Sequence, residues 1–176
     1  MIIRDQQHDE DAAVGRLLTA AFGDDGRVAR LSAALRSRPD YGAALVAEHE
    51  GELVGCVQLS TSWVDAEREL VEVCVLSPLG VLPGHQRRGI GGALVKAAID
   101  AAERRGVPLV FLEGDPRYYA RLGWERASGY GFTPPSTRIP DPGFQVVRLS
   151  GWQQWMTGAL VYNDTFWSHD CVGLRS

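Results

Sequence analysis

The sequence of 176 residues has few of the residues on which several protein classes depend. Its three cysteines, Cys56, Cys74 and Cys171, are widely and irregularly spaced, which argues against a disulfide framework or a zinc site. Its four histidines are scattered and form no metal-binding signature. An odd number of cysteines suits a reducing compartment. We therefore expect a cytoplasmic protein that holds no metal.

Long apolar runs and an excess of positive charge are also missing. No run approaches the about 18 apolar residues that a membrane-spanning helix needs, and residues 1–11 contain no apolar signal core. The formal net charge is −4, whereas general nucleic-acid binders are usually basic. We therefore expect neither a membrane nor a nucleic acid as partner. The length suits a single domain over residues 1–176.

What the sequence does contain is a strand, a glycine-rich turn and a helix start, read as Val81-Leu82-Pro83-Gly84-His85-Gln86-Arg87-Arg88-Gly89-Ile90-Gly91-Gly92. The first turn of a helix leaves about four N–H groups unpaired and carries about half a positive charge, so it binds anions. Gly89 and Gly91 let the backbone approach a ligand closely. Arg87 and Arg88 stand where a purely structural helix disfavours cations. The pattern therefore predicts a pyrophosphate-binding segment.

Two familiar glycine patterns fit this segment poorly or in part. A P-loop needs Lys and then Ser or Thr after its second glycine, but Gly89 is followed by Ile90 and Gly91. That pattern is excluded. A dinucleotide fingerprint needs a small residue where Leu94 stands and an acidic residue further on, a place that Glu113 partly fits. A nicotinamide-dependent oxidoreductase therefore stays open as an alternative.

A third pattern fits throughout. Gln86-Arg87-Arg88-Gly89-Ile90-Gly91, placed after Val81-Leu82-Pro83, resembles the acetyl-CoA-binding motif of the GNAT superfamily of N-acetyltransferases. The resemblance implies an α/β (α+β) acyl-CoA N-acyltransferase fold, with a mixed, mostly antiparallel central sheet, a splayed parallel strand pair and flanking helices. It implies acetyl-CoA as cosubstrate. The residues it assigns to cofactor binding are Leu79, Gly80, Val81, Arg87, Arg88, Gly89, Ile90, Gly91 and Gly92.

Apolar periodicity and turn residues outline the remaining elements. Strands are predicted over residues 1–4, 43–48, 53–59, 70–81, 107–112 and 144–149, and helices from Asp9 or Asp11 to Gly23, from about Asp25 to before Pro39, and over residues 89–105. Pro78 lacks an N–H, so we expect a local disruption of the strand near residues 77–79. The aromatic segment 152–176 either completes the core or lines an acceptor pocket.

Residues 114–124 predict a short helix with a cap at each end. Asp115 fits the N-cap, and Gly123 fits the position after the last turn. Tyr119 stands four residues before Gly123, and Trp124 follows, so the segment resembles the Tyr-x-x-x-Gly-Phe signature of the superfamily. The resemblance implies that Tyr119 is the general acid of the reaction. The alternative is that Tyr119 only packs in the core.

The hypothesis from these motifs is an N-acetyltransferase that moves the acetyl group of acetyl-CoA to a primary amine by direct attack in a ternary complex. A catalytically inactive CoA-binding sensor or structural module is the alternative. The sequence leaves open the amine acceptor, a small molecule or peptide, and whether the chain forms a homodimer. Glu72 and Asp115 do not qualify clearly as the general base, and Cys74 stays open as a nucleophile.

Overall fold

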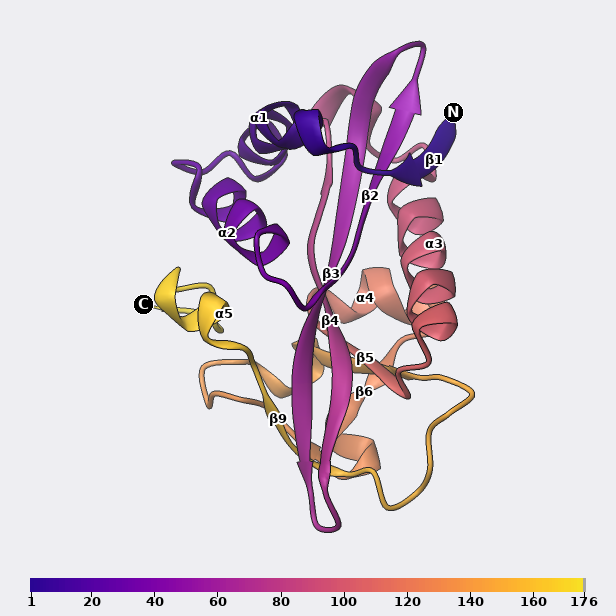
Figure 1. Ribbon diagram of the computed structural model, residues 1–176, viewed down its shortest axis with the longest axis vertical. Helices are drawn as coiled ribbons and strands as arrows, with labels where there is room; N and C mark the ends of the chain where they lie inside the picture. The colour runs from indigo at the N-terminus through magenta and orange to yellow at the C-terminus, as the bar shows by residue number, and fades with distance from the viewer. Residues whose placement is uncertain (176) are drawn as a thin grey trace. The chain divides into compact units, whose positions relative to one another are not determined.

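The computed structural model describes residues 1–175, which form two compact units (Figure 1). Unit 1 comprises residues 1–60 and 76–101, and unit 2 comprises residues 61–75 and 102–175. The single domain expected from the sequence stays a prediction. The helices are α1 (Asp11–Phe22), α2 (Arg27–Arg36), α3 (Ile90–Arg105), α4 (Pro116–Tyr119) and α5 (Asp164–Ser168). Short 3₁₀ helices are η1 (His8–Glu10), η2 (Pro83–His85), η3 (Ala120–Leu122), η4 (Ala127–Tyr130) and η5 (Asp141–Gly143).

The strands are β1 (Ile2–Asp5), β2 (Tyr41–His49), β3 (Glu52–Ala66), β4 (Leu70–Val81), β5 (Leu109–Glu113), β6 (Glu125–Arg126), β7 (Phe132–Thr133), β8 (Phe144–Arg148) and β9 (Gly158–Val161). In unit 1, β1 pairs antiparallel with β2, and β2 pairs antiparallel with β3. The turn between β2 and β3 has positive φ angles at Glu50 (53°) and Gly51 (81°), as a tight hairpin requires. The predicted hairpin is confirmed.

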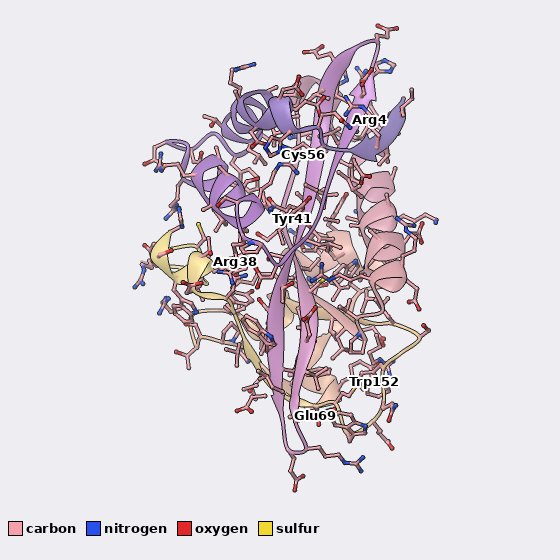
Figure 2. The ribbon with its side chains drawn as sticks, in the orientation of Figure 1. Arg4, Arg38, Tyr41, Cys56, Glu69 and Trp152 are labelled. Carbon is pink, nitrogen blue, oxygen red and sulfur yellow. The ribbon has the colours of Figure 1, made fainter. Side chains whose placement is uncertain are left out.

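Helices cover both faces of the sheet in unit 1, with α1 and α2 on one face and α3 on the other (Figure 1). The apolar side of α1 packs on β2 and β3 in a cluster of Val14, Leu17, Leu18, Val46 and Cys56. Figure 2 marks Cys56 within this cluster. On the opposite face Leu94 of α3 lies so close to Gly55 that a Cβ there would stand 2.9 Å from Leu94 Cδ1. The predicted helix over residues 89–105 is confirmed as α3.

Arg4 of β1, labelled in Figure 2, connects the first strand to two other elements of unit 1. Its Nη2 atom donates to Glu10 Oε1 at 2.6 Å and to Glu48 Oε2 at 2.8 Å. Charge-assisted hydrogen bonds of this kind are stronger than neutral ones, and these are half-buried. They join β1, η1 and β2.

Unit 2 contains the parallel strand pair. Cys74 and Val75 of β4 pair with Val110 and Phe111 of β5, and the described chain has no further registered pair between these strands. β5 and β6 each pair antiparallel with β8, while β9 pairs antiparallel with β3 and parallel with β7. The mixed, mostly antiparallel sheet with a short parallel pair agrees with the predicted fold class.

The strand has a local irregularity where a disruption was predicted, at Ser77–Pro78. β4 runs unbroken from Leu70 to Val81, and the Ser77–Pro78 peptide bond is cis. Registered pairing with β5 ends at Val75, so the N–H that Pro78 lacks costs no bond in that ladder.

The short strands β6 and β7, strand β9 and the extension of β3 have no counterpart in the sequence prediction. β3 continues to Ala66, well beyond residue 59, through Ser60, Thr61 and Ser62, which are polar but buried. β9 pairs with this extension. Polar residues give no alternation of apolar and polar positions, so the pattern that reveals strands is missing here.

The aromatic C-terminal segment contributes to the core of unit 2. Tyr162 and Phe166 are buried, with their ring centroids 4.6 Å apart, whereas Trp167 is 44% exposed. Phe111 packs against Phe132 and Phe144 at centroid distances of 5.0 and 5.7 Å. Among residues 1–175, no helix is both long and apolar enough to cross a bilayer.

Replacing Leu18 with alanine tests the packing of α1 on the sheet. Leu18 is fully buried, so Leu18→Ala should lower the free energy of unfolding by about 2–5 kcal/mol through lost burial and a cavity. Phe22→Ala on the same helix is the control, because Phe22 is 47% exposed. Chemical denaturation measures both. Equal losses in the two variants would contradict this packing.

Candidate functional site

The glycine loop, defined as residues 86–92, runs from the end of η2 into the first turn of α3 in unit 1. Hydrogen bonds fix the chain before it: Leu82 N donates to Val54 O at 2.9 Å, and Gln86 Nε2 donates to Val81 O at 3.1 Å. Within the loop, φ is 82° at Gly89, a conformation that costs glycine nothing. Arg87 also has a positive φ, 60°, which a non-glycine residue adopts only when its surroundings impose it.

The backbone N–H groups at the start of α3 are unpaired. The first helical bond runs from Ala93 N to Gly89 O at 3.0 Å. In the described chain, the N–H groups of residues 88–92 donate no hydrogen bond. Arg87, Arg88 and Gly89 are exposed, and no acidic residue lies in the first turn of α3. The helix dipole therefore adds to the arginine charges without local compensation, which favours an anion at this place.

The last residues of β4 precede this loop in the same unit. Leu79 and Val81 are half-buried, while Gly80 is buried against α1. A Cβ on Gly80 would stand 2.9 Å from Leu18 Cδ2. Gly80 therefore allows α1 to pack closely on β4, which is a structural reason for glycine at this position. The nine predicted cofactor-binding residues all belong to unit 1.

The short helix α4 lies in unit 2 and has the predicted caps. Asp115 Oδ1 accepts from Arg117 N at 2.9 Å, and Gly123 has a φ of 86°. The Arg117 guanidinium and N–H lower the pKa of Asp115. Asp115 is thus a helix cap held ionised by its neighbour, and a carboxylate with a lowered pKa is a weak general base.

Tyr119, at the end of α4, lies against Gly114. A Cβ on Gly114 would stand 2.5 Å from Tyr119 Cε2 and 2.9 Å from Tyr119 Cδ2. The Tyr119 ring meets those of Tyr118 and Trp124 edge to face, at centroid distances of 4.9 and 5.9 Å. Its hydroxyl makes no hydrogen bond within residues 1–175. Burial raises the pKa of Tyr119 above its usual value near 10, so the hydroxyl keeps its proton at neutral pH.

Gly114 is held from two sides. Its N–H donates to Gly143 O at 3.0 Å, and its carbonyl accepts from Gln145 Nε2 at 3.2 Å. Gln145 is a buried polar residue whose amide finds its partner here, as buried polar groups require. The backbone beneath the Tyr119 ring is therefore fixed.

The other candidate side chains have structural partners or unsuitable surroundings. Burial raises the pKa of Cys74 to about 11 and that of Cys56 to about 12, so both remain thiols rather than nucleophilic thiolates. Glu72 Oε1 accepts from Arg105 Nη2 at 3.1 Å. Within residues 1–175 no group of three or more His, Cys, Asp and Glu side chains is arranged to hold a metal ion.

Sequence reasoning assigned no catalytic role to Glu113, which ends β5. Its Oε1 atom accepts from Gly173 N at 3.0 Å. Burial raises its pKa to about 7, against smaller opposite effects of that N–H and of Arg138. Glu113 is exposed as a whole residue, and its contact with solvent opposes this effect of burial. Arg138 and Gly173 lie 25 and 60 residues further along the chain than Glu113, too far for a local sequence pattern to reveal these contacts.

Comparison with known proteins identifies the family. Residues 2–127 match the acetyltransferase (GNAT) domain family. The chain belongs to the GNAT acetyltransferase family. Among its relatives in Escherichia coli K12, the uncharacterized N-acetyltransferase YhbS is 29% identical over 170 residues, covering 94% of this chain and 98% of the relative. The uncharacterized N-acetyltransferase YjhQ is 32% identical over 126 residues, covering 70% and 68%.

Solved GNAT structures share this fold. The crystal structure of E. coli YhbS in complex with CoA has a TM-score of 0.83 at 27% identity and covers 94% of this chain and 91% of its own. A GNAT family acetyltransferase from Brucella melitensis, in complex with acetyl-CoA, has a TM-score of 0.76 at 24% identity and covers 94% and 97%. GNAT membership makes the chain an acyltransferase and leaves the oxidoreductase alternative without support.

Substituting Gly114 tests whether this glycine is required for the placement of the Tyr119 ring. In Gly114→Ala the added methyl overlaps Tyr119, so we expect the free energy of unfolding to fall by about 1–3 kcal/mol through overpacking. Gly129→Ala in the same unit is the matched control, because a Cβ there meets nothing within 4 Å. Urea denaturation measures both variants. An undiminished stability of Gly114→Ala would show that the ring shifts freely.

Proposed function

We propose that the protein transfers the acetyl group of acetyl-CoA to a primary amine by direct attack in a ternary complex. The observation that carries this proposal is the run of unpaired N–H groups over residues 88–92, beside two exposed arginines, in a GNAT family chain. The complexes of related acetyltransferases with CoA and acetyl-CoA support the same cosubstrate here.

The glycine loop binds the diphosphate of acetyl-CoA in this proposal. Phosphate oxygens accept hydrogen bonds from the N–H groups of residues 88–92, and the side chains of Arg87 and Arg88 add opposite charge. Gly89 leaves room for this approach, since a Cβ there would meet no protein atom within 4 Å. The GNAT resemblance assigns the pantetheine arm to the backbone of Leu79, Gly80 and Val81.

The chemistry needs a site for developing negative charge and a proton for the leaving group. Attack of a neutral amine on the thioester carbonyl places negative charge on the oxygen, and a backbone N–H near Leu79 or Gly80 stabilises it. Losing one such donor typically lowers the rate by roughly 10²–10³. As the carbon–sulfur bond breaks, the CoA thiolate takes the proton of the Tyr119 hydroxyl, which has no competing partner in the described chain.

Neutralising both loop arginines tests the diphosphate site. Hydrogen bonds to charged groups contribute about 1.5–3 kcal/mol each, so the double variant Arg87→Gln/Arg88→Gln should weaken CoA binding by about tenfold or more. The salt dependence of binding should fall as well, because fewer charges take part. Calorimetry with CoA at two salt concentrations measures both effects. Arg104→Gln, at the other end of α3, is the control; an equal loss in both proteins would place the effect outside the loop.

Replacing Tyr119 tests the general acid in an assay of CoA release from acetyl-CoA with a library of amines. Tyr119→Phe should lower kcat by roughly 10²–10⁴ and leave the Kd of CoA nearly unchanged, because the ring stays and only the proton donor is lost. Tyr118→Phe is the matched control and should retain turnover. Unchanged kcat in Tyr119→Phe would remove Tyr119 from the mechanism. CoA binding by the wild type without CoA release with any amine would favour a sensor instead.

A further inference from the structure

Gln145 of β8 is a buried polar side chain that reaches the backbone beneath the Tyr119 ring. It is 2% exposed, and its Nε2 atom donates to Gly114 O at 3.2 Å. A carbonyl oxygen only accepts hydrogen bonds, so this contact also fixes which end of the amide faces Gly114. An apolar side chain could be buried here without losing hydrogen bonds to water. The glutamine therefore calls for a reason beyond the filling of the core.

Strand pairing places Gln145 on the same face of the sheet as the Tyr119 ring. Gln145 stands opposite Leu112 in the β5–β8 ladder, and side chains directly opposite each other in antiparallel strands point to one face. A Cβ on Gly114 would stand 3.3 Å from Leu112 Cδ1 and 2.5 Å from Tyr119 Cε2. The Gln145 amide, the Gly114 backbone and the Tyr119 ring therefore form one series of contacts within unit 2.

The peptide group at Gly114 is held by β8 at two positions. Its N–H donates to Gly143 O at 3.0 Å, and Gln145 donates to its carbonyl oxygen. Gly143 also allows a close approach, since a Cβ there would stand 3.3 Å from Gly114 O. Two glycines and one buried amide thus serve the placement of a single peptide group.

The position of the Tyr119 hydroxyl depends on the packing of its ring. The hydroxyl makes no hydrogen bond within residues 1–175, so no partner in the described chain holds it directly. The rings of Tyr118 and Trp124 meet the Tyr119 ring edge to face. The Gly114 backbone is the neighbour that two hydrogen bonds hold in place. It is therefore the contact that yields least.

We propose that Gln145 is a positioning residue for the acetyl transfer, because it holds the Gly114 carbonyl on which the Tyr119 ring rests and so sets the place of the hydroxyl. This inference rests on the acetyltransferase function and on the general acid proposed above. A general acid must come within about 2.6–3.2 Å of the atom that it protonates. A displacement of about 1 Å can lower the rate by roughly 10². Gln145 touches no reacting atom in this role.

A double-mutant cycle tests the proposal with the full chain, acetyl-CoA and an amine from the acceptor screen. Gln145→Met keeps an unbranched side chain and removes the donor, so kcat should fall by roughly tenfold to 10²-fold. The Kd of CoA should stay unchanged, because residues 86–92 are untouched. In a Tyr119→Phe background the same substitution should change kcat by less than about twofold, since no acid is left to misplace. An equal loss in both backgrounds would reduce Gln145 to a structural role.

Gly143→Ala reaches the same peptide group by another route and decides the case if Gln145→Met does not fold. The added Cβ would stand 3.3 Å from Gly114 O, so the carbonyl has to give by a few tenths of an ångström. We expect kcat to fall by about two- to tenfold, and the loss to disappear in the Tyr119→Phe background. Gly129→Ala is its control, because a Cβ there meets nothing within 4 Å. An undiminished kcat in Gly143→Ala would overturn the proposal.

Gln58→Met is the matched control for the loss of a buried amide. Gln58 is 3% exposed, and its amide lies 2.9 Å from Ser32 Oγ of α2. Any effect of Gln58→Met on kcat should be the same with and without Tyr119. A loss that disappears in the Tyr119→Phe background for Gln58→Met as well would contradict a specific role of Gln145. Circular dichroism and the CoA affinity of each variant report on folding.

Failure of the proposed function gives a different result from failure of this inference. A wild type that releases no CoA with any amine would contradict the acetyltransferase function. An unchanged kcat in Tyr119→Phe would remove the general acid, and the role of Gln145 with it. A slow Tyr119→Phe variant in which Gln145→Met still causes its full loss would contradict this inference alone.

Discussion

The backbone N–H groups at the start of α3 are the feature on which the proposed function depends. Every protein must satisfy such groups with side chains, water or a ligand. Within residues 1–175 no side chain caps these groups and no acidic residue lies in the first turn of α3, and two exposed arginines stand beside them. Each of these three features lowers the stability of an isolated helix and raises the affinity of the helix N-terminus for an anion. Together they favour a bound anion over water.

This helix end is fixed by packing as well as by hydrogen bonds. Ile90, the first residue of α3, is 5% exposed, and a Cβ on Gly55 would lie 3.1 Å from its Cγ2 atom. Its side chain therefore anchors the helix to β3 while its N–H stays free for a ligand. Gly80 allows a similarly close approach of α1 on the other face. Glycines at these two positions hold the sheet and both helices together near the loop.

The sequence predicted the elements whose signals are local. Caps at Asp115 and Gly123, the β2–β3 turn and the periodicity of α3 each depend on residues a few positions apart, and these elements were confirmed. The extension of β3 and strand β9 depend on distant partners. Asn163 donates through Nδ2 to Thr61 O at 2.8 Å, across 102 residues. A buried polar segment of this kind is stable only with such a partner, so its neighbours in the sequence give no signal.

The candidate site likewise combines residues with a local sequence signal and residues whose surroundings come from distant parts of the chain. The glycine loop and Tyr119 are carried by short motifs, whereas the surroundings of Glu113 come from residues 138, 162 and 173. Burial raises the pKa of both Tyr119 and Glu113, with opposite consequences for an acid and a base. A carboxylate with a raised pKa takes a proton more readily. A tyrosine with a raised pKa gives its proton less readily to a thiolate, since thiols ionise near about pH 8.5.

In the proposed mechanism, that unfavourable transfer is offset within the same reaction. The nitrogen of the tetrahedral intermediate carries an acidic proton once its bond to carbon has formed, and this proton restores the tyrosine hydroxyl. The resting enzyme therefore keeps Tyr119 neutral, and the acid acts only when the amine has attacked. On this argument, amine attack and thiolate departure are coupled through proton transfer.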